Sequence, residues 1–141
     1  MSYNLPSKNE IENNFLNCSN WEEKYLYLIE LGNKIPILSK KKHSLENMIP
    51  GCQSRVWVLL EIDSNNNIKF KGDSDSSIIR GLLTMIFIFY NKKNYDEIIN
   101  FNIQTYFKNL SFDKYLTTSR SESINIIIKN IKNKLKKLIC K

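Results

Sequence analysis

Hydrophobic residues recur three and four positions apart at the start of the chain, which is the spacing of one face of a helix. Ser7 and Glu10 form a capping-box pattern ahead of the first such stretch, so a short helix is expected after Ser7. The stretch 20–32 repeats the pattern with Asn20 as its cap and Gly32 as its stop. Two helices are therefore predicted before residue 33.

A second group of helices is expected in the C-terminal half. The stretch 76–90 is apolar nearly all round, which predicts a helix buried on most sides, with Gly81 allowing another element to approach closely. Ser119 and Glu122 form a further capping box and open a final helix with one apolar stripe and one lysine face. Shorter helices are expected over 95–100, 103–110 and 112–116.

The middle of the chain carries the strand signals. Residues 55–62 are rich in Val, Leu, Ile and Trp, residues 63–67 read as a turn, and residues 68–71 alternate apolar and polar. A short strand is also expected over 48–50. The predicted fold class is α+β, with a small antiparallel sheet of about three strands packed by helices.

Length and composition set broad limits. The chain has 141 residues, which predicts one domain over residues 1–141. Its longest apolar run, residues 82–90, is too short for a membrane span, and the first residues lack the pattern of a secretion signal. We therefore expect a cytoplasmic protein that does not bind membranes.

The net charge of +7 is unevenly distributed. Residues 124–141 hold six lysines and no acid, whereas the other 123 residues hold 15 basic and 14 acidic side chains. Since Lys, Asn and Ile are over-used throughout, this excess is typical of compositional drift. A basic nucleic-acid or anionic-surface module using the C-terminal helix remains the alternative from another class.

Three cysteines and one histidine restrict the chemistry. Cys18, Cys52 and Cys140 form no CxxC pair, and a zinc site would need all three together with His43. We expect no metal and no cofactor. Cys18 is expected to be a small buried residue, and His43 a solvated loop residue with nothing nearby in sequence to orient it.

Cys52 is the candidate reactive residue. Gly51 before it indicates a special backbone conformation or a close approach, and polar Gln53 and Ser54 follow it at the end of a predicted strand. A cysteine hydrolase would need His43 as a base and an orienting third group. Sulfur transfer needs only an accessible thiolate, which Arg55 or a folded-back Arg120 could favour.

Asp73 and Asp75 stand two apart before the helix over 76–90. A catalytic carboxylate pair is one interpretation, and a helix cap interacting with the helix dipole is the simpler one.

Several blocks of the sequence resemble the SufE family of sulfur acceptors, in the family's order. They are NWEEKYLYLIELG (20–32), GCQSRVWV (51–58), GDSD (72–75) and TSRS (118–121). The resemblance implies an α+β fold with the reactive cysteine on a loop at one end of the sheet. It implies that Cys52 takes sulfur as a persulfide from a SufS-like cysteine desulfurase, stimulates that enzyme and passes the sulfur to the SufBCD scaffold for iron–sulfur cluster assembly.

The resemblance also implies supporting roles near the loop for Asp73, Asp75 and Arg120, and a thiol tucked inward at rest. The chain would be a covalent sulfur carrier and not a free-standing enzyme. A CsdE-like acceptor serving another desulfurase is the alternative within this chemistry, and a homodimer is left open. The chain departs from the family at His43, where Arg is common, and at Thr118 and Ser123, which replace Pro and Gly.

Overall fold

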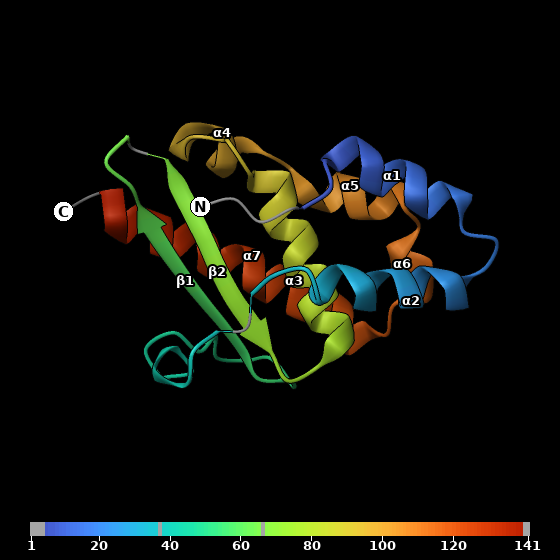
Figure 1. Cartoon of the computed structure of the whole chain (residues 1–141), viewed down its shortest axis with the longest axis horizontal. Coiled ribbons are helices and arrows are strands. Elements are labelled where there is room, and N and C mark those ends of the chain that lie inside the picture. The colour runs from blue at the N-terminus through green and yellow to red at the C-terminus, as the bar shows by residue number, and fades with distance from the viewer. Residues whose placement is uncertain (1–4, 37, 66, 140–141) are drawn as a thin grey trace.

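The computed structural model describes residues 5–36, 38–65 and 67–139. In chain order the elements are α1 (Lys8–Asn17), α2 (Trp21–Gly32), the 3-10 helix η1 (Lys40–Lys42), β1 (Val56–Ile62), β2 (Ile68–Ser74), α3 (Ser77–Tyr90), α4 (Tyr95–Asn100), α5 (Ile103–Asn109), α6 (Phe112–Tyr115) and α7 (Thr118–Ile139). Figure 1 shows the β1–β2 hairpin on one side of the molecule, α7 running behind it, and α3 at the centre. The predicted α+β class is confirmed.

The sheet is an antiparallel pair in which Val56 faces Ser74 and Ile62 faces Ile68. The expected third strand over 48–50 is reduced to one isolated bridge, between Met48 and Trp57. Within the described residues the sheet therefore has two strands. The hairpin turn at 63–67 is held by the Asp63 carboxylate, which accepts from the amides of Asn65 and Asn67 at 2.9 Å each.

Helix α3 organises the core, because every residue from Gly81 to Tyr90 is buried. Gly81 brings α3 against α2, since a Cβ at Gly81 would lie 2.2 Å from the carbonyl oxygen of Leu28. The predicted close approach is confirmed. Gly32 ends α2, and a Cβ there would lie 3.0 Å from the Gly81 amide. The next residue, Asn33, has right-handed helical backbone, so α2 does not end in a left-handed glycine cap. Gly32 instead allows α2 and α3 to pack closely.

Helix starts largely follow the predicted caps. The Ser7 and Asn20 side chains accept from the amides of Glu10 and Glu23. Two caps differ from expectation. The α3 cap is Ser76 and not an aspartate of GDSD, which belongs largely to β2. Helix α7 begins at Thr118, before the predicted Ser119, and the Thr117 hydroxyl accepts from the Arg120 amide.

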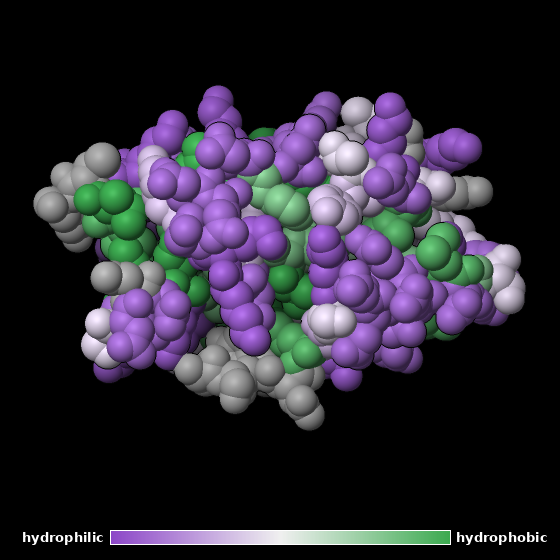
Figure 2. Space-filling view, turned by 90° about the horizontal axis from the view of Figure 1, so that it is seen from above, coloured by the Kyte–Doolittle hydropathy of each residue, from purple (hydrophilic) through white to green (hydrophobic). Residues whose placement is uncertain are grey.

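One face of the molecule is mostly polar. Figure 2 shows hydrophilic side chains over most of one face, with hydrophobic ones visible between them. Across the described residues no helix combines the length and apolar character needed to cross a membrane.

Candidate functional site

Cys52 lies on a loop of residues 50–55 at the end of the hairpin opposite the 63–67 turn (Figure 1). The base of the loop is closed where the Ile49 amide donates to the Val56 carbonyl at 2.8 Å. Gly51 is exposed and has φ +94°, a conformation that disfavours any residue with a Cβ. The special backbone predicted for Gly51 is confirmed. The loop is thus short, its two ends are joined by a hydrogen bond, and Gly51 makes its turn.

A second set of hydrogen bonds holds the far side of the loop to β2. The Arg55 amide donates to the Asp75 carboxylate at 3.0 Å, and the Asp75 amide donates back to the Arg55 carbonyl at 3.2 Å. The Ser74 hydroxyl donates to the same carbonyl at 2.8 Å. Asp75 therefore binds backbone three residues from Cys52, and it neither caps α3 nor pairs with Asp73.

The Cys52 side chain is partly buried against the core, while Gln53 next to it is exposed. Its covering element is α7. The side chain of Ile126 lies within 3.6 Å of where a Gly51 Cβ would stand, and the Ser123 hydroxyl hydrogen-bonds the thiol. Burial raises the pKa of the Cys52 thiol, and the Ser123 bond partly offsets the shift. At neutral pH the thiol in this position is protonated and poorly nucleophilic.

Arg120 is on the same helix but is directed elsewhere. Its guanidinium lies 5.7 Å from the centre of the Tyr25 ring on α2, and the Arg55 side chain is exposed. Among the described residues, burial and Ser123 account for the pKa shift of Cys52, without an arginine. The thiolate-favouring role predicted for Arg120 or Arg55 is not seen with the thiol tucked inward.

Asp73 is the centre of a separate polar cluster behind the loop. Its carboxylate lies 2.7 Å from His43 Nε2 and 3.5 Å from Arg80 Nη1. It also accepts a hydrogen bond from the Ser74 amide. The His43 ring packs edge-on against Trp57, 4.4 Å between centroids. The prediction of a solvated, unoriented His43 is therefore wrong, because a residue thirty positions away in sequence orients it. This cluster ties the 33–47 connection to the hairpin that carries Cys52.

Cys18, at the C-terminal end of α1, is only partly buried, so the prediction of a buried residue is not met, and Cys140 lies outside the described residues. In the part of the chain that the structure describes, no three His, Cys, Asp or Glu side chains gather as metal ligands would.

Two residues of the site were not singled out as contacts by the sequence. Ser123 had a signal only as a departure from the family, where Gly is common, and the structure places that departure against the Cys52 thiol. Ile126 had no signal beyond its place on the apolar side of the last helix.

The comparison with protein families agrees with this geometry. The model for SufE, described as an Fe–S metabolism associated domain, matches residues 9–135. The match includes the Cys52 loop, the GDSD stretch and the start of α7, which are the parts brought together here. The chain belongs to the SufE family and has a role in iron–sulfur metabolism.

Proposed function

We propose that the chain, acting as one SufE-like domain, accepts sulfur on Cys52 from a SufS-like cysteine desulfurase and delivers it to a SufBCD scaffold. The observation that carries the proposal is the position of the Cys52 thiol. Cys52 follows the positive-φ Gly51 on a loop closed at both ends by hydrogen bonds, and its partly buried thiol hydrogen-bonds Ser123 of α7.

The transfer step needs one thiolate and no oxidant. The Cys52 thiolate attacks the outer sulfur of the donor's cysteine persulfide, the S–S bond breaks, and the donor cysteine leaves as a thiolate. Cys52 then carries the sulfur as its own persulfide. A thiolate on the scaffold would repeat the same exchange, so atoms and electrons balance at each step.

Burial of the resting thiol suits a carrier. In the tucked position the raised pKa keeps the sulfur protonated, which limits alkylation and over-oxidation. Moving the loop outward removes the desolvation that raises the pKa and exposes the sulfur to the donor. Pro50 and Gly51, which are exposed and directly precede Cys52, are positioned to lead that movement.

The proposal is tested by mass spectrometry after incubation with a SufS-type desulfurase and cysteine. The wild-type chain is expected to gain about 32 Da, one sulfur, and to raise desulfurase turnover. Cys52→Ser is expected to do neither, while Cys18→Ser, the matched control, behaves as wild type. A Cys52→Ser chain that still gained sulfur and still raised turnover would overturn the proposal.

A further inference from the structure

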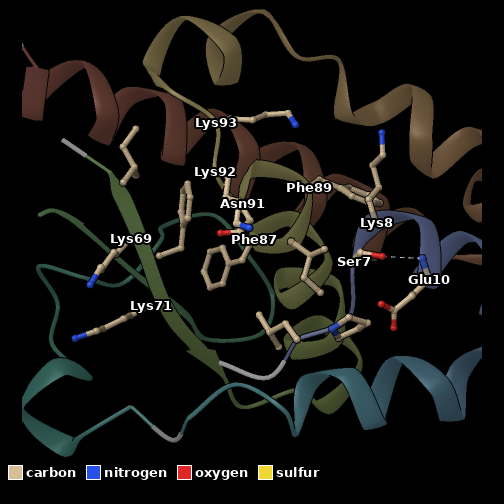
Figure 3. A pocket seen from close by; sticks show the side chains of 15 residues that line it. Ser7, Lys8, Glu10, Lys69, Lys71, Phe87, Phe89, Asn91, Lys92 and Lys93 are labelled. Atoms are coloured by element: carbon tan, nitrogen blue, oxygen red, sulfur yellow. Dashed lines mark hydrogen bonds between the residues drawn. The ribbon is translucent and has the colours of Figure 1, made fainter. Parts of the chain in front are cut away.

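A groove of about 640 Å³ lies along β2 at the end of the hairpin away from Cys52. Its other walls are the segment before α1 with the first turn of that helix, and the C-terminal end of α3 with the residues after it. Figure 3 shows Lys69 and Lys71 projecting from one side of β2 and Phe87 lying on the other. The groove is lined by residues from both faces of the strand, Lys69 and Lys71 on one and Ile68 and Phe70 on the other, so it follows the strand's edge.

Within the described residues, the edge of β2 that faces the groove is paired with no strand. β1 is the only strand hydrogen-bonded to β2 within the described residues, so the opposite edge of β2 has no neighbouring strand there. A strand edge presents backbone N–H and C=O groups that another extended chain can bind.

The groove is also basic. Five lysines line it (Lys8, Lys69, Lys71, Lys92 and Lys93) against one acid, Glu10. Two of the lysines are held by aromatic side chains: Lys8 donates to the Tyr106 hydroxyl at 2.8 Å, and Lys93 lies 4.8 Å from the centre of the Phe101 ring. These contacts fix positive charge on the wall facing β2 (Figure 3).

The geometry points to this groove as a docking site for an extended segment of a partner protein in which acidic and apolar side chains alternate. Side chains of an added strand alternate between two faces. One set would meet the lysine face of β2, and the other the apolar floor by Ile68 and Leu5. Because the groove and the Cys52 loop are at opposite ends of the hairpin, the segment can stay bound while sulfur is exchanged.

Nucleic acid fits this groove less well. Single-stranded nucleic acid binds on exposed aromatic faces, whereas Phe70, Phe87 and Phe89 are each at most 8% exposed. An open strand edge also matches the backbone of a peptide.

The test uses a fluorescein-labelled peptide of seven residues alternating Glu and Val, with a peptide of the same composition in two blocks as control. Binding is followed by anisotropy, and the site by amide hydrogen exchange. The alternating peptide is expected to bind more tightly than the block peptide and to slow exchange within 68–73. Lys69→Gln with Lys92→Gln is expected to weaken binding about fivefold. The matched control, Lys129→Gln with Lys136→Gln on exposed positions of α7, is expected to leave it unchanged.

Four results would overturn the inference. They are no binding at millimolar peptide, equal binding of the two peptides, equal losses in the groove and α7 variants, or tighter, groove-lysine-dependent binding of oligothymidine. The Cys52→Ser chain is expected to bind the peptide as wild type does, so the outcome is independent of the sulfur-transfer proposal.

Discussion

Cys18 and Cys52 are both partly buried free thiols whose pKa is raised by burial, yet the elements that carry them differ. Cys18 ends α1, where its thiol donates to the Asn14 carbonyl at 3.2 Å. Burial raises its pKa, and the carboxylates of Glu23 and Glu30 raise it further. Cys52 is on a loop, beside a positive-φ glycine, and burial raises its pKa while the hydrogen bond with Ser123 partly offsets that shift. The comparison teaches that two partly buried free thiols can lie on very different elements, a helix end for Cys18 and a glycine-turned loop for Cys52.

The largest effect is expected at Gly51. Gly51→Ala places a Cβ at φ +94°, and the penalty is torsional, because the added atom meets Ile126 at an ordinary 3.6 Å. Left-handed backbone costs an L-residue about 1–2 kcal/mol, so the closed loop should open more often and Cys52 alkylation should rise about tenfold. The rate at which iodoacetamide alkylates each cysteine is followed by mass spectrometry, with Cys18 as the internal reference. Gly51→Asn should raise the Cys52 alkylation rate less, because Asn tolerates a positive φ better than Ala does. An equal rise in the Cys18 rate in the Gly51→Ala chain would contradict the account.

A smaller increase in the alkylation of Cys52 is expected when the Asp75 carboxylate is removed. Asp75→Ala loses the carboxylate that accepts from the Arg55 amide, a bond worth about 1 kcal/mol, so Cys52 alkylation should rise about fivefold. Asp63→Ala is the matched control, since it loosens the other end of the hairpin in the same way. Equal effects of the two variants on Cys52 would show that the Asp75 contact does not hold the loop.

The pH dependence of alkylation should be shifted upward at both thiols. Because the folded-state pKa of Cys52 is raised, its buried neutral thiol stabilises the closed loop fully below the ordinary thiol pKa. That contribution is lost as pH rises through the raised pKa. Alkylation profiles of both cysteines should therefore have midpoints above those of the unfolded chain in urea. A Cys52 midpoint at or below the unfolded value would contradict the tucked geometry.

Two substitutions should move these midpoints in opposite directions. Ser123→Ala removes the bond that lowers the pKa of Cys52, so that midpoint should rise. Glu23→Gln removes a charge that raises the pKa of Cys18, so that midpoint should fall, while the amide oxygen can still accept from the Ser19 amide. A shift at the other cysteine in either variant would mean a general change in structure.

The smallest effect is expected at Arg120. Its guanidinium lies over Tyr25, so Arg120→Gln should change Cys52 alkylation less than twofold in the isolated chain. A larger decrease in the Cys52 alkylation rate would instead support a role for Arg120 in favouring the thiolate at rest.

Much of the fold was predictable because local signals and packing agree. Ser7, Asn20 and the apolar run of α3 act within one turn or one face of a helix, so the sequence pattern is enough to place them. The third strand was over-predicted, since residues 48–50 are followed at once by the Cys52 turn and pair at only one bridge.

In the candidate site, the loop position of Cys52 and the backbone conformation of Gly51 were predictable, because both depend on neighbouring residues. Its remaining contacts join residues far apart in sequence. Neither Asp75 binding the Arg55 backbone, nor Asp73 orienting His43, nor Ser123 covering Cys52 has a signature at fixed spacing. Each depends on hairpin register or on how α7 lies across the loop.

The most direct measurement locates the transferred sulfur with both cysteines present in one molecule. Wild-type chain is incubated with a SufS-type desulfurase and cysteine, alkylated, and cleaved after Lys24, Lys42 and Arg55, which puts Cys18 and Cys52 on separate peptides. The account predicts the added mass of about 32 Da on the peptide 43–55 that carries Cys52, with Cys18 alkylated directly. Sulfur on the Cys18 peptide, or divided equally between the two, would contradict it.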